Sequence, residues 1–255
     1  MSKQTESGMK IAVVGGGVAG IVSAYLLQQK HQVTLFEQND YLGGHTNTIV
    51  LQDGPDAGLA VDAGFIFLND ATYPLFQKFL AQLGVATRVA EMSFGFRCLQ
   101  TGLVYAGNDL NGLFAAWPLL QAHDRQLPAA DGRPPLLPEQ RSAWAAWNFT
   151  RESSSSDAKP AHVSYYMNLL QGFSAQRHYC VTLNRQQTFR PETVIAEFDY
   201  HHPQYSFASL ATQVELPTLN GQRNSCFCGS DFGYGFHEDA VRSAVATAKN
   251  FGIEL

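Results

Sequence analysis

The chain has 255 residues, of which 45% are apolar and 15% charged, with a formal net charge of −5. This balance excludes intrinsic disorder and the basic stripe of a nucleic-acid-binding protein, and the length suffices for one large domain or two small ones. The scattered cysteines Cys98, Cys180, Cys226 and Cys228 make neither a disulfide framework nor a CxxC pair. We therefore expect reduced thiols and a cytoplasmic protein.

The N-terminal region contains an uncharged apolar run that could suggest a membrane segment, but its length and composition argue against one. Residues 1–9 are polar and mixed in charge, so we expect a disordered leader rather than a secretory signal. The uncharged run 11–27 is shorter than the ~20 apolar residues of a membrane span, and three consecutive glycines interrupt it. We expect no transmembrane segment.

The same run has the pattern of a strand, a glycine turn and a helix. Residues 11–14 predict a strand, an apolar stripe predicts a helix up to Lys30, and residues 33–36 predict a second strand that Glu37 closes. The turn between the first strand and the helix consists of Gly15, Gly16, Gly17, Val18, Ala19 and Gly20. A GxGxxG turn in this position, followed 22 residues after Gly15 by an acid, is the context of a dinucleotide-binding fingerprint.

Each residue of the fingerprint has a physical task. Gly15 permits the tight turn, Gly17 allows backbone to approach a pyrophosphate, and Gly20 lets helix and strand pack closely. The helix N-terminus offers free N–H groups to phosphate. We expect Glu37, beside Gln38, to accept hydrogen bonds from the adenosine ribose.

A glycine pair follows the acid. Five residues separate Glu37 from Gly43-Gly44-His45, which suggests a further backbone approach to an extended cofactor. With this E-x5-GG spacing the sequence resembles the flavoprotein superfamily of amine oxidases, protoporphyrinogen oxidase and phytoene desaturase. The resemblance implies FAD as the cofactor. Most members have Arg where this chain has His45.

The resemblance narrows along the chain to a bacterial subfamily described as predicted FAD-dependent oxidoreductases. Its motifs include "VDAGFIFLNDATYPLF" at 61–76, "VSYYMNLLQG" and "FCGSDFGYGFHEDAVRSA", and it covers most of 10–120 and 136–252. It implies that Gly64 and Phe65 lie near the flavin. Members also carry a long central segment that is missing between Gln121 and Leu136, which reflects either a natural deletion or an altered gene product.

The C-terminal motif is a second strand, glycine loop and helix. Residues 226–228 predict a buried strand, residues 229–235 a loop with three glycines, and a helix begins at His237. The resemblance implies that Gly229, Ser230 and Asp231 lie at the ribityl-phosphate and that Phe236, His237 and Glu238 lie at the flavin. An alternative, compatible with the first, is a helix cap with favourable acids.

Other motifs are weaker. Position 241 is Val, so the helix carries no HExxH zinc motif, and we expect no metal site. His201-His202-Pro203 predicts a turn rather than metal ligands. Tyr165 and Tyr166 lie in a strand-like stretch, where sheet packing is favoured over a place in a substrate cavity.

The fold class expected is α/β: a Rossmann-like FAD-binding domain with a strand-rich, shortened second domain. The expected ranges are 1–9 leader, 10–121 N-terminal FAD-binding part, 122–138 proline-rich junction, 139–224 strand-rich substrate-side part with helices near 191–198 and 206–213, and 225–255 C-terminal FAD-binding part.

Two main functions are open at this point. The first is an FAD-dependent oxidoreductase that transfers a hydride from a C–H bond of an apolar, lipid-like small molecule to the flavin; no acid–base residue stands out. The second is a non-catalytic nucleotide-binding remnant without its substrate domain. A minor alternative, an NAD-dependent dehydrogenase, leaves Gly43-Gly44 and the C-terminal loop without a purpose.

Overall fold

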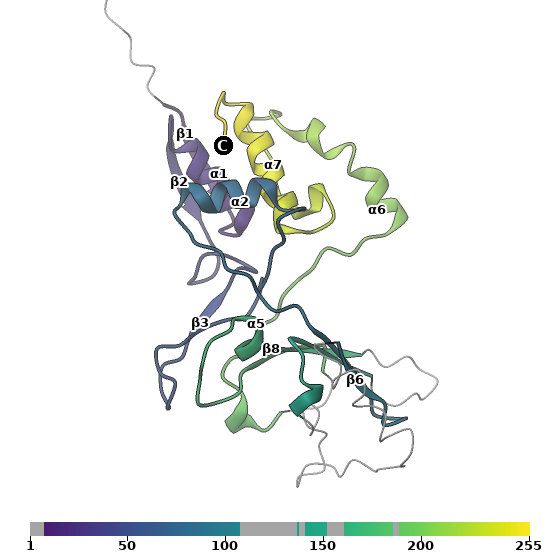
Figure 1. The fold of residues 1–255 in the computed structure, drawn as a ribbon. Helices are drawn as coiled ribbons and strands as arrows, with labels where there is room; N and C mark the ends of the chain where they lie inside the picture. Colours follow the sequence, from purple (N-terminus) through teal and green to yellow (C-terminus); the bar gives the residue numbers. More distant parts are fainter. Residues whose placement is uncertain (1–7, 108–136, 138–140, 152–160, 186–188) are drawn as a thin grey trace, which may run out of the picture. The chain divides into compact units, whose positions relative to one another are not determined.

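A computed structural model describes residues 8–107, 137, 141–151, 161–185 and 189–255 (Figure 1). The chain divides into two compact units. The first comprises residues 1–48, 62–87 and 198–255, and the second comprises residues 49–61 and 88–197. No helix in the described ranges combines the length and the apolar character that crossing a membrane requires.

The first unit begins with the predicted βαβ arrangement. Strand β1 (Lys10–Val14) pairs in parallel with β2 (Gln32–Phe36), and helix α1 (Val18–Leu27) connects them. The register joins Ile11 to Val33 and Val14 to Phe36. The prediction of a Rossmann-like strand, glycine turn, helix and strand is therefore confirmed.

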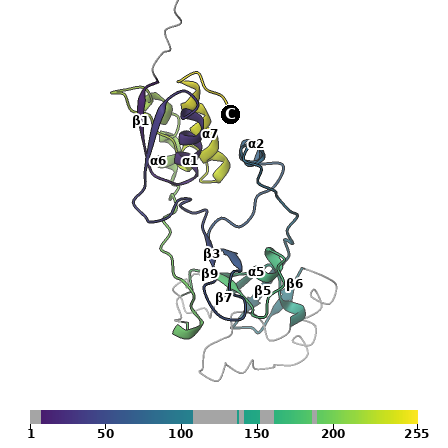
Figure 2. The ribbon, with the colours of Figure 1, turned by 90° about the vertical axis from the view of Figure 1, so that its left-hand side faces the viewer.

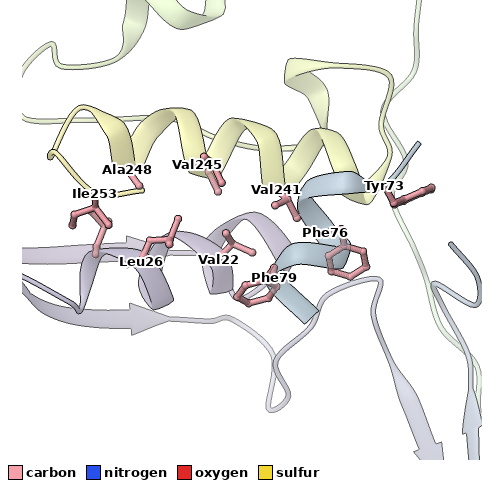
Figure 3. Packing of buried hydrophobic residues seen from close by; sticks show 11 residues of the cluster. Val22, Leu26, Tyr73, Phe76, Phe79, Val241, Val245, Ala248 and Ile253 are labelled. Atoms are coloured by element: carbon pink, nitrogen blue, oxygen red, sulfur yellow. The ribbon is translucent and has the colours of Figure 1, made fainter. Parts of the chain in front are cut away.

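Three helices enclose the core of this unit. Helix α7 (His237–Lys249) lies along α1, and α2 (Pro74–Gln82) packs against both helices (Figures 1 and 2). Figure 3 shows Val22 and Leu26 of α1 facing Val241 and Val245 of α7, with Phe79 of α2 at one end. Burial of such side chains stabilises by about 1.5–3 kcal/mol each, so the core fixes the C-terminal helix against the N-terminal βαβ.

The remaining elements of the first unit are short. Helix α6 (Phe207–Thr212) begins at a capping box in which Ser206 and Ser209 exchange hydrogen bonds. The 3-10 turns Leu216–Leu219 and Ser230–Phe232 follow. Gln213 donates to the carbonyls of Asp231 and Gly233 at 2.9 and 2.5 Å, which ties the α6 segment to the loop before α7.

The second unit contains a sheet in which the strand order is β6-β5-β7-β8-β9 among the described residues. The bounds are β5 (Phe94–Cys98), β6 (Val104–Ala106), β7 (Trp147–Arg151), β8 (His162–Tyr166) and β9 (Cys180–Leu183). β5 and β7 run parallel and the other neighbours antiparallel. Short elements of this unit are α5 (Met167–Leu170) and the 3-10 turns Arg141–Ala143 and Pro191–Thr193. The short strands β3 (Thr48–Val50) and β4 (Ala60–Asp62) each have one terminal residue in the first unit and the rest in the second.

The two faces of this sheet differ in chemistry. One face is aromatic, with Phe96 stacked on Phe149 at 6.0 Å and Trp147 edge-on to Tyr165 at 5.1 Å. The opposite face is polar but buried, and Asn148, only 4% exposed, bonds to both backbone groups of Ala145. Tyr165 lies in strand β8, as predicted, and its ring is on the aromatic face of the sheet.

The units differ from the ranges expected from sequence. β5 and β6, expected in the N-terminal FAD-binding part, join β7 in the second unit, because their partners in hydrogen bonding lie there. Residues 198–224 belong to the first unit, through contacts such as those of Gln213. Residues 1–7 of the expected leader, and the 122–138 junction apart from Leu137, lie outside the described residues.

Two predicted elements are wrong. Residues 226–228 form no strand, because no described strand pairs with them; in this sheet β1 pairs only with β2 among the described residues. Phe227 is 52% exposed rather than buried. The helix expected near 191–198 is only the 3-10 turn Pro191–Thr193. The helix expected at 206–213 is confirmed as α6.

Candidate functional site

The glycine turn after β1 has the geometry that its sequence predicts. Gly15 has φ +103°, which side-chain-bearing residues rarely adopt. A Cβ on Gly20 would lie 1.8 Å from the carbonyl oxygen of Gly15, so the helix can approach the strand only with glycine there. A Cβ on Gly17 would meet no atom within 4 Å, so this peptide faces open space. A group placed outside the turn can therefore contact bare backbone.

The N-terminus of α1 is free to bind an anion. Gly17 is the N-cap, Val18 and Ala19 begin the first turn, and this turn has neither an acidic residue nor a side-chain cap. The first N–H groups of a helix have no partner within the helix, and the helix dipole adds a partial positive charge there. The turn and the helix together form a phosphate-binding arrangement.

Glu37, at the end of β2, reaches back to the turn. Its Oε2 accepts the N–H of Gly16 at 2.5 Å, and its Oε1 accepts the N–H groups of Gln38 and Asn39 at 2.8 and 2.9 Å. These bonds, that of Asn39 foremost, lower the pKa of the Glu37 carboxyl, which is ionised at neutral pH. The Glu37 carboxylate also borders open space, where a ribose hydroxyl can reach it.

An open depression of about 430 Å³ adjoins this carboxylate. It is lined by Val14, Gly15, Phe36, Glu37 and Gln38. The residues expected at the adenosine end of a dinucleotide thus surround one concave surface.

The glycine pair folds back onto the same turn. The N–H of Gly43 donates to the carbonyl of Gly16 at 2.8 Å, and Gly43 forms a parallel bridge with Gly17. Gly43 and Gly44 have φ of +119° and +59°, and a Cβ on Gly43 would lie 2.1 Å from the carbonyl oxygen of Thr46. The structure therefore brings both glycine motifs together.

The 62–65 stretch lies beside the residues that follow the glycine pair. Phe65 donates its N–H to the carbonyl of His45 at 2.6 Å, and Ala63 donates to Asn47 at 2.8 Å. A Cβ on Gly64 would lie 1.9 Å from the His45 carbonyl oxygen. Gly64 and Phe65, which the resemblance implies near the flavin, are thus neighbours of His45.

The C-terminal loop is fixed by a serine that the sequence analysis missed. Ser243, a buried residue of α7, accepts the N–H of Gly229 at 2.9 Å and lies 3.0 Å from its carbonyl oxygen. Cys228 lies 3.4 Å from Ser23 of α1 through their Sγ and Oγ atoms. Ser230 is half-buried and Asp231 exposed. No spacing rule singles out Ser243, because serine is common in helices of this composition.

The first turn of α7 is occupied by its own acids. Glu238, 3% exposed, accepts the N–H groups of Leu75 and Phe76 at 3.1 and 2.9 Å and so caps α2. Asp239 accepts the N–H groups of Tyr234 and Phe236 at 2.9 and 3.1 Å. The helix-cap interpretation is therefore confirmed for these acids, and both oxygens of the Glu238 carboxylate accept hydrogen bonds from α2.

His237 and Phe236 are placed differently. Phe236 is 58% exposed, whereas the ring of His237 lies 3.9 Å from that of Phe65 and its Nε2 lies 3.1 Å from Oγ1 of Thr46. Burial, with a smaller contribution from His45, lowers the pKa of His237 to about 4. His237 is neutral at physiological pH.

Tyr200 is a further residue that the sequence analysis missed. Its ring lies 4.8 Å from that of His45, and its hydroxyl accepts a hydrogen bond from Asn47 at 3.1 Å. His202 contacts the same imidazole edge-on at 4.7 Å. Within the described residues no three His, Cys, Asp or Glu side chains converge as a metal ion would require.

Comparison with known proteins finds a family match over part of the chain. Residues 13–83 match the family model of the NAD(P)-binding Rossmann-like domain. A 4,4'-diapolycopen-4-al dehydrogenase of Metabacillus indicus is 54% identical over 37 residues, which are 14% of this chain and 8% of that protein.

Solved structures share a limited likeness. A CLA-producing fatty acid isomerase from P. acnes is 22% identical with a TM-score of 0.32, over 44% of this chain and 25% of that one. A putrescine oxidase (21% identical) and a putative protoporphyrinogen oxidase from Exiguobacterium sp. (18% identical) each reach 0.31, over 40% of this chain and 22% of theirs. The chain thus spans a quarter or less of the length of these proteins.

The family match coincides with the geometry. Residues 13–83 contain the glycine turn, Glu37, the glycine pair and the 62–65 stretch, all assembled in the first unit. Residues 13–83 therefore combine a match to the NAD(P)-binding Rossmann-like domain with the strand, glycine turn, helix and strand of that fold.

Proposed function

We propose that the chain binds FAD and acts as a flavin-dependent oxidoreductase of the amine oxidase and desaturase type. The observation that carries this proposal is the junction of the two glycine motifs, where Gly43 hydrogen-bonds to Gly16 and bridges Gly17. An NAD site requires the GxGxxG turn and the acid alone. Here the backbone continues past the acid and returns to the turn, as a longer cofactor would need.

The residues present fit FAD. Glu37 would hold the adenosine ribose, and the N-terminus of α1 would hold the pyrophosphate, because it is uncapped and free of acids. The loop at Gly229 would approach the cofactor as well, because Ser243 binds this loop to α7 and α7 packs against α1. The chemistry that FAD supplies when bound is the acceptance of a hydride equivalent.

An apolar substrate is supported by the sheet of the second unit. Its aromatic face is built from uncharged side chains: Phe94, Phe96, Tyr105, Trp147, Phe149 and Tyr165. Aromatic surface binds apolar groups through burial of area and ring contacts. We propose a lipid-like molecule with an oxidisable C–H bond, for which this chain has no need of a dedicated acid or base.

A second candidate is a non-catalytic dinucleotide-binding protein. It is favoured by the sheet of the first unit, in which only β1 and β2 pair among the described strands. Val14 is 84% exposed and Phe36 54% exposed, so one face of this sheet is open beside the nucleotide depression. An open site of this kind would bind a cofactor more weakly and protect it less from water.

The test is a titration of the purified chain with FAD, followed by visible absorption and flavin fluorescence, with NAD⁺ and NADP⁺ titrated in parallel. Glu37→Gln removes the charge and one acceptor oxygen at the adenosine end. Glu192→Gln, on an exposed side chain, is the matched control. We expect FAD to bind, Glu37→Gln to weaken binding about tenfold through loss of a charged hydrogen bond, and the control to leave it unchanged.

The outcomes separate the candidates. Binding of NAD⁺ but not FAD would establish the dehydrogenase alternative, and binding of neither would refute both. With FAD bound, anaerobic addition of oleic acid or oleylamine should bleach the flavin band if the chain is an oxidoreductase. A bound flavin that such apolar donors leave oxidised favours the non-catalytic candidate.

A further inference from the structure

The segment Phe198–His202 is extended chain that covers residues expected at the flavin. The Tyr200 ring lies 4.8 Å from the His45 imidazole at an interplanar angle of 31°, and His202 meets the same imidazole edge-on. Phe198 stacks on Tyr200 at 5.7 Å and 10°. One face and one edge of His45 are therefore occupied by this segment.

The Tyr200 hydroxyl reaches two further stretches. It accepts the amide N–H of Asn47 at 3.1 Å, and a Cβ built on Gly64 would lie 3.4 Å from it. Because Gly64 lies against the carbonyl of His45, Tyr200 covers the 45–47 and 62–65 stretches at once. The ring of His237, in turn, stacks on Phe65 at 3.9 Å.

Tyr200 occupies the space over one face of His45 and beside Gly64 that a planar ring would need. Carbon atoms of stacked groups approach to about 3.5–4 Å, so a flavin ring cannot lie against that face of His45 while Tyr200 is there. The adenosine end differs, because the depression beside Glu37 is open. Only one half of the proposed cofactor site is accessible in this conformation.

The covering segment is held weakly. Among the described residues it is fixed to the domain by the hydrogen bond from Asn47, a backbone hydrogen bond between His201 and the His45 ring, and two ring contacts. His201 and His202 are exposed. The covered conformation also leaves Nε2 of His45 buried without a hydrogen-bond partner among the described residues. An unpaired buried nitrogen is unfavourable, so opening the segment relieves a cost of the closed state.

We infer that Phe198–His202 is a clasp that closes the flavin end of the dinucleotide site in the free chain and must move away before the whole cofactor can bind. This inference rests on the proposed function, because the group that the clasp excludes is the flavin of the proposed cofactor. Binding then proceeds from the open adenosine end, and the fraction of open chains sets the apparent affinity.

The histidines at the clasp make its closure depend on pH. Burial and the charges of His202 and His201 lower the pKa of His45, although a backbone bond from His201 opposes this, and His45 contributes to the lowered pKa of His237. Opening would remove part of the burial of His45 and the influence of His201 and His202, so the pKa of His45 would rise and the open state would bind more protons than the closed state. Acidification below about pH 6.5 favours opening.

The test compares Tyr200→Ala, Tyr200→Phe and Phe207→Ala. Phe207, 96% exposed on the neighbouring helix α6, is the control for loss of an aromatic ring. Stopped-flow quenching of flavin fluorescence gives the association rate and the Kd for FAD. We expect Tyr200→Ala to raise the association rate and lower the Kd about tenfold, in proportion to the open fraction. Tyr200→Phe should change both less, and the control not at all.

Weaker or unchanged FAD binding in Tyr200→Ala would overturn the clasp while leaving the proposed function intact. Amide hydrogen exchange of the cofactor-free chain provides an independent readout. Tyr200→Ala should increase exchange at 198–202 and 45–47 and leave α1 and α7 protected. Unchanged exchange overturns the clasp whether or not FAD binds, and absence of FAD binding in every variant refutes the proposed function.

Discussion

The two helices that begin after glycine-rich loops, α1 and α7, use their N-termini in opposite ways. α1 begins at an uncapped Gly17 with no acid in its first turn, whereas α7 begins with Glu238 and Asp239, both buried and hydrogen-bonded. In sequence both read as strand, glycine loop and helix. The comparison indicates that acids in the first turn decide whether the helix N-terminus can bind an external anion or is occupied by hydrogen bonds within the protein.

The two helices therefore have different roles, although they pack in the same hydrophobic core. The partial charge of about +0.5 at the α1 N-terminus stays available to a phosphate. At α7 the same positive potential is satisfied by Asp239, while Glu238 caps α2 and Ser243 holds Gly229. α7 thus positions the site rather than binding its charge.

The largest expected effect is the loss of stability when Glu238, the residue of α7 that caps α2, is replaced. Glu238→Ala leaves the buried N–H of Phe76 and the half-buried N–H of Leu75 without this acceptor, and should lower the free energy of unfolding by about 3 kcal/mol. Urea unfolding followed by circular dichroism measures this. FAD affinity per folded molecule should stay the same. If stability were unaffected but FAD affinity lost, Glu238 would be a cofactor ligand after all.

The second largest effect is expected for a substitution in the glycine turn, and it should change FAD affinity rather than stability. Gly17→Ala adds a methyl group into open space at φ −74°, which alanine tolerates, but the methyl occupies the path of a pyrophosphate. We expect FAD to bind about 30-fold more weakly, equivalent to ~2 kcal/mol of steric conflict, with stability changed by less than about 1 kcal/mol. Gly107→Ala, in the second unit and with only an ordinary contact of 3.6 Å from its Cβ to the Phe94 carbonyl oxygen, serves as the control. Equal FAD affinity in both variants would place the pyrophosphate elsewhere.

A smaller effect is expected at the loop that α7 positions. Ser243→Ala removes the acceptor of the Gly229 N–H and should cost about 1 kcal/mol of stability. Because Gly229 would also move relative to α1, FAD should dissociate faster while ADP binding stays unchanged. Calorimetric titration with both ligands distinguishes these results, and an equal loss for ADP would show that Gly229 serves the adenosine end.

The smallest effect at neutral pH concerns His237. Its pKa of about 4 in the folded chain lies below that of an unfolded histidine, so the folded state binds fewer protons. The stability contributed by neutral His237 is fully present above about pH 6.5 and is lost as the pH falls toward about 4. His237→Gln should flatten the pH dependence of urea unfolding in this window. A slope identical to that of the unmodified chain would contradict the burial of His237.

Local signals predicted the N-terminal half of the site. Gly15, Gly20 and Glu37 could be assigned because a turn, a close approach and an acid after a strand each demand particular residues at fixed spacing. The C-terminal helix was likewise predictable from its apolar period. The strand at 226–228 was not, because an apolar run predicts a strand only where a neighbouring strand pairs with it.

The contacts between distant segments could not be read from the sequence. Glu238 looks the same whether it faces a ligand or the backbone of α2, 162 residues away in sequence from Phe76. Tyr200 carries no motif, and its neighbour His202 suggested only a turn. Such roles depend on tertiary packing, which local spacing does not encode.

In the proposed site the α1 turn binds the adenosine diphosphate half of the cofactor and the clasp covers the other half. Calorimetric titration of the free chain with ADP and, separately, with FMN distinguishes the two halves. We expect ADP to bind and to compete with FAD, and FMN, which lacks the adenosine half, not to bind. Binding of FMN without binding of ADP would contradict this arrangement.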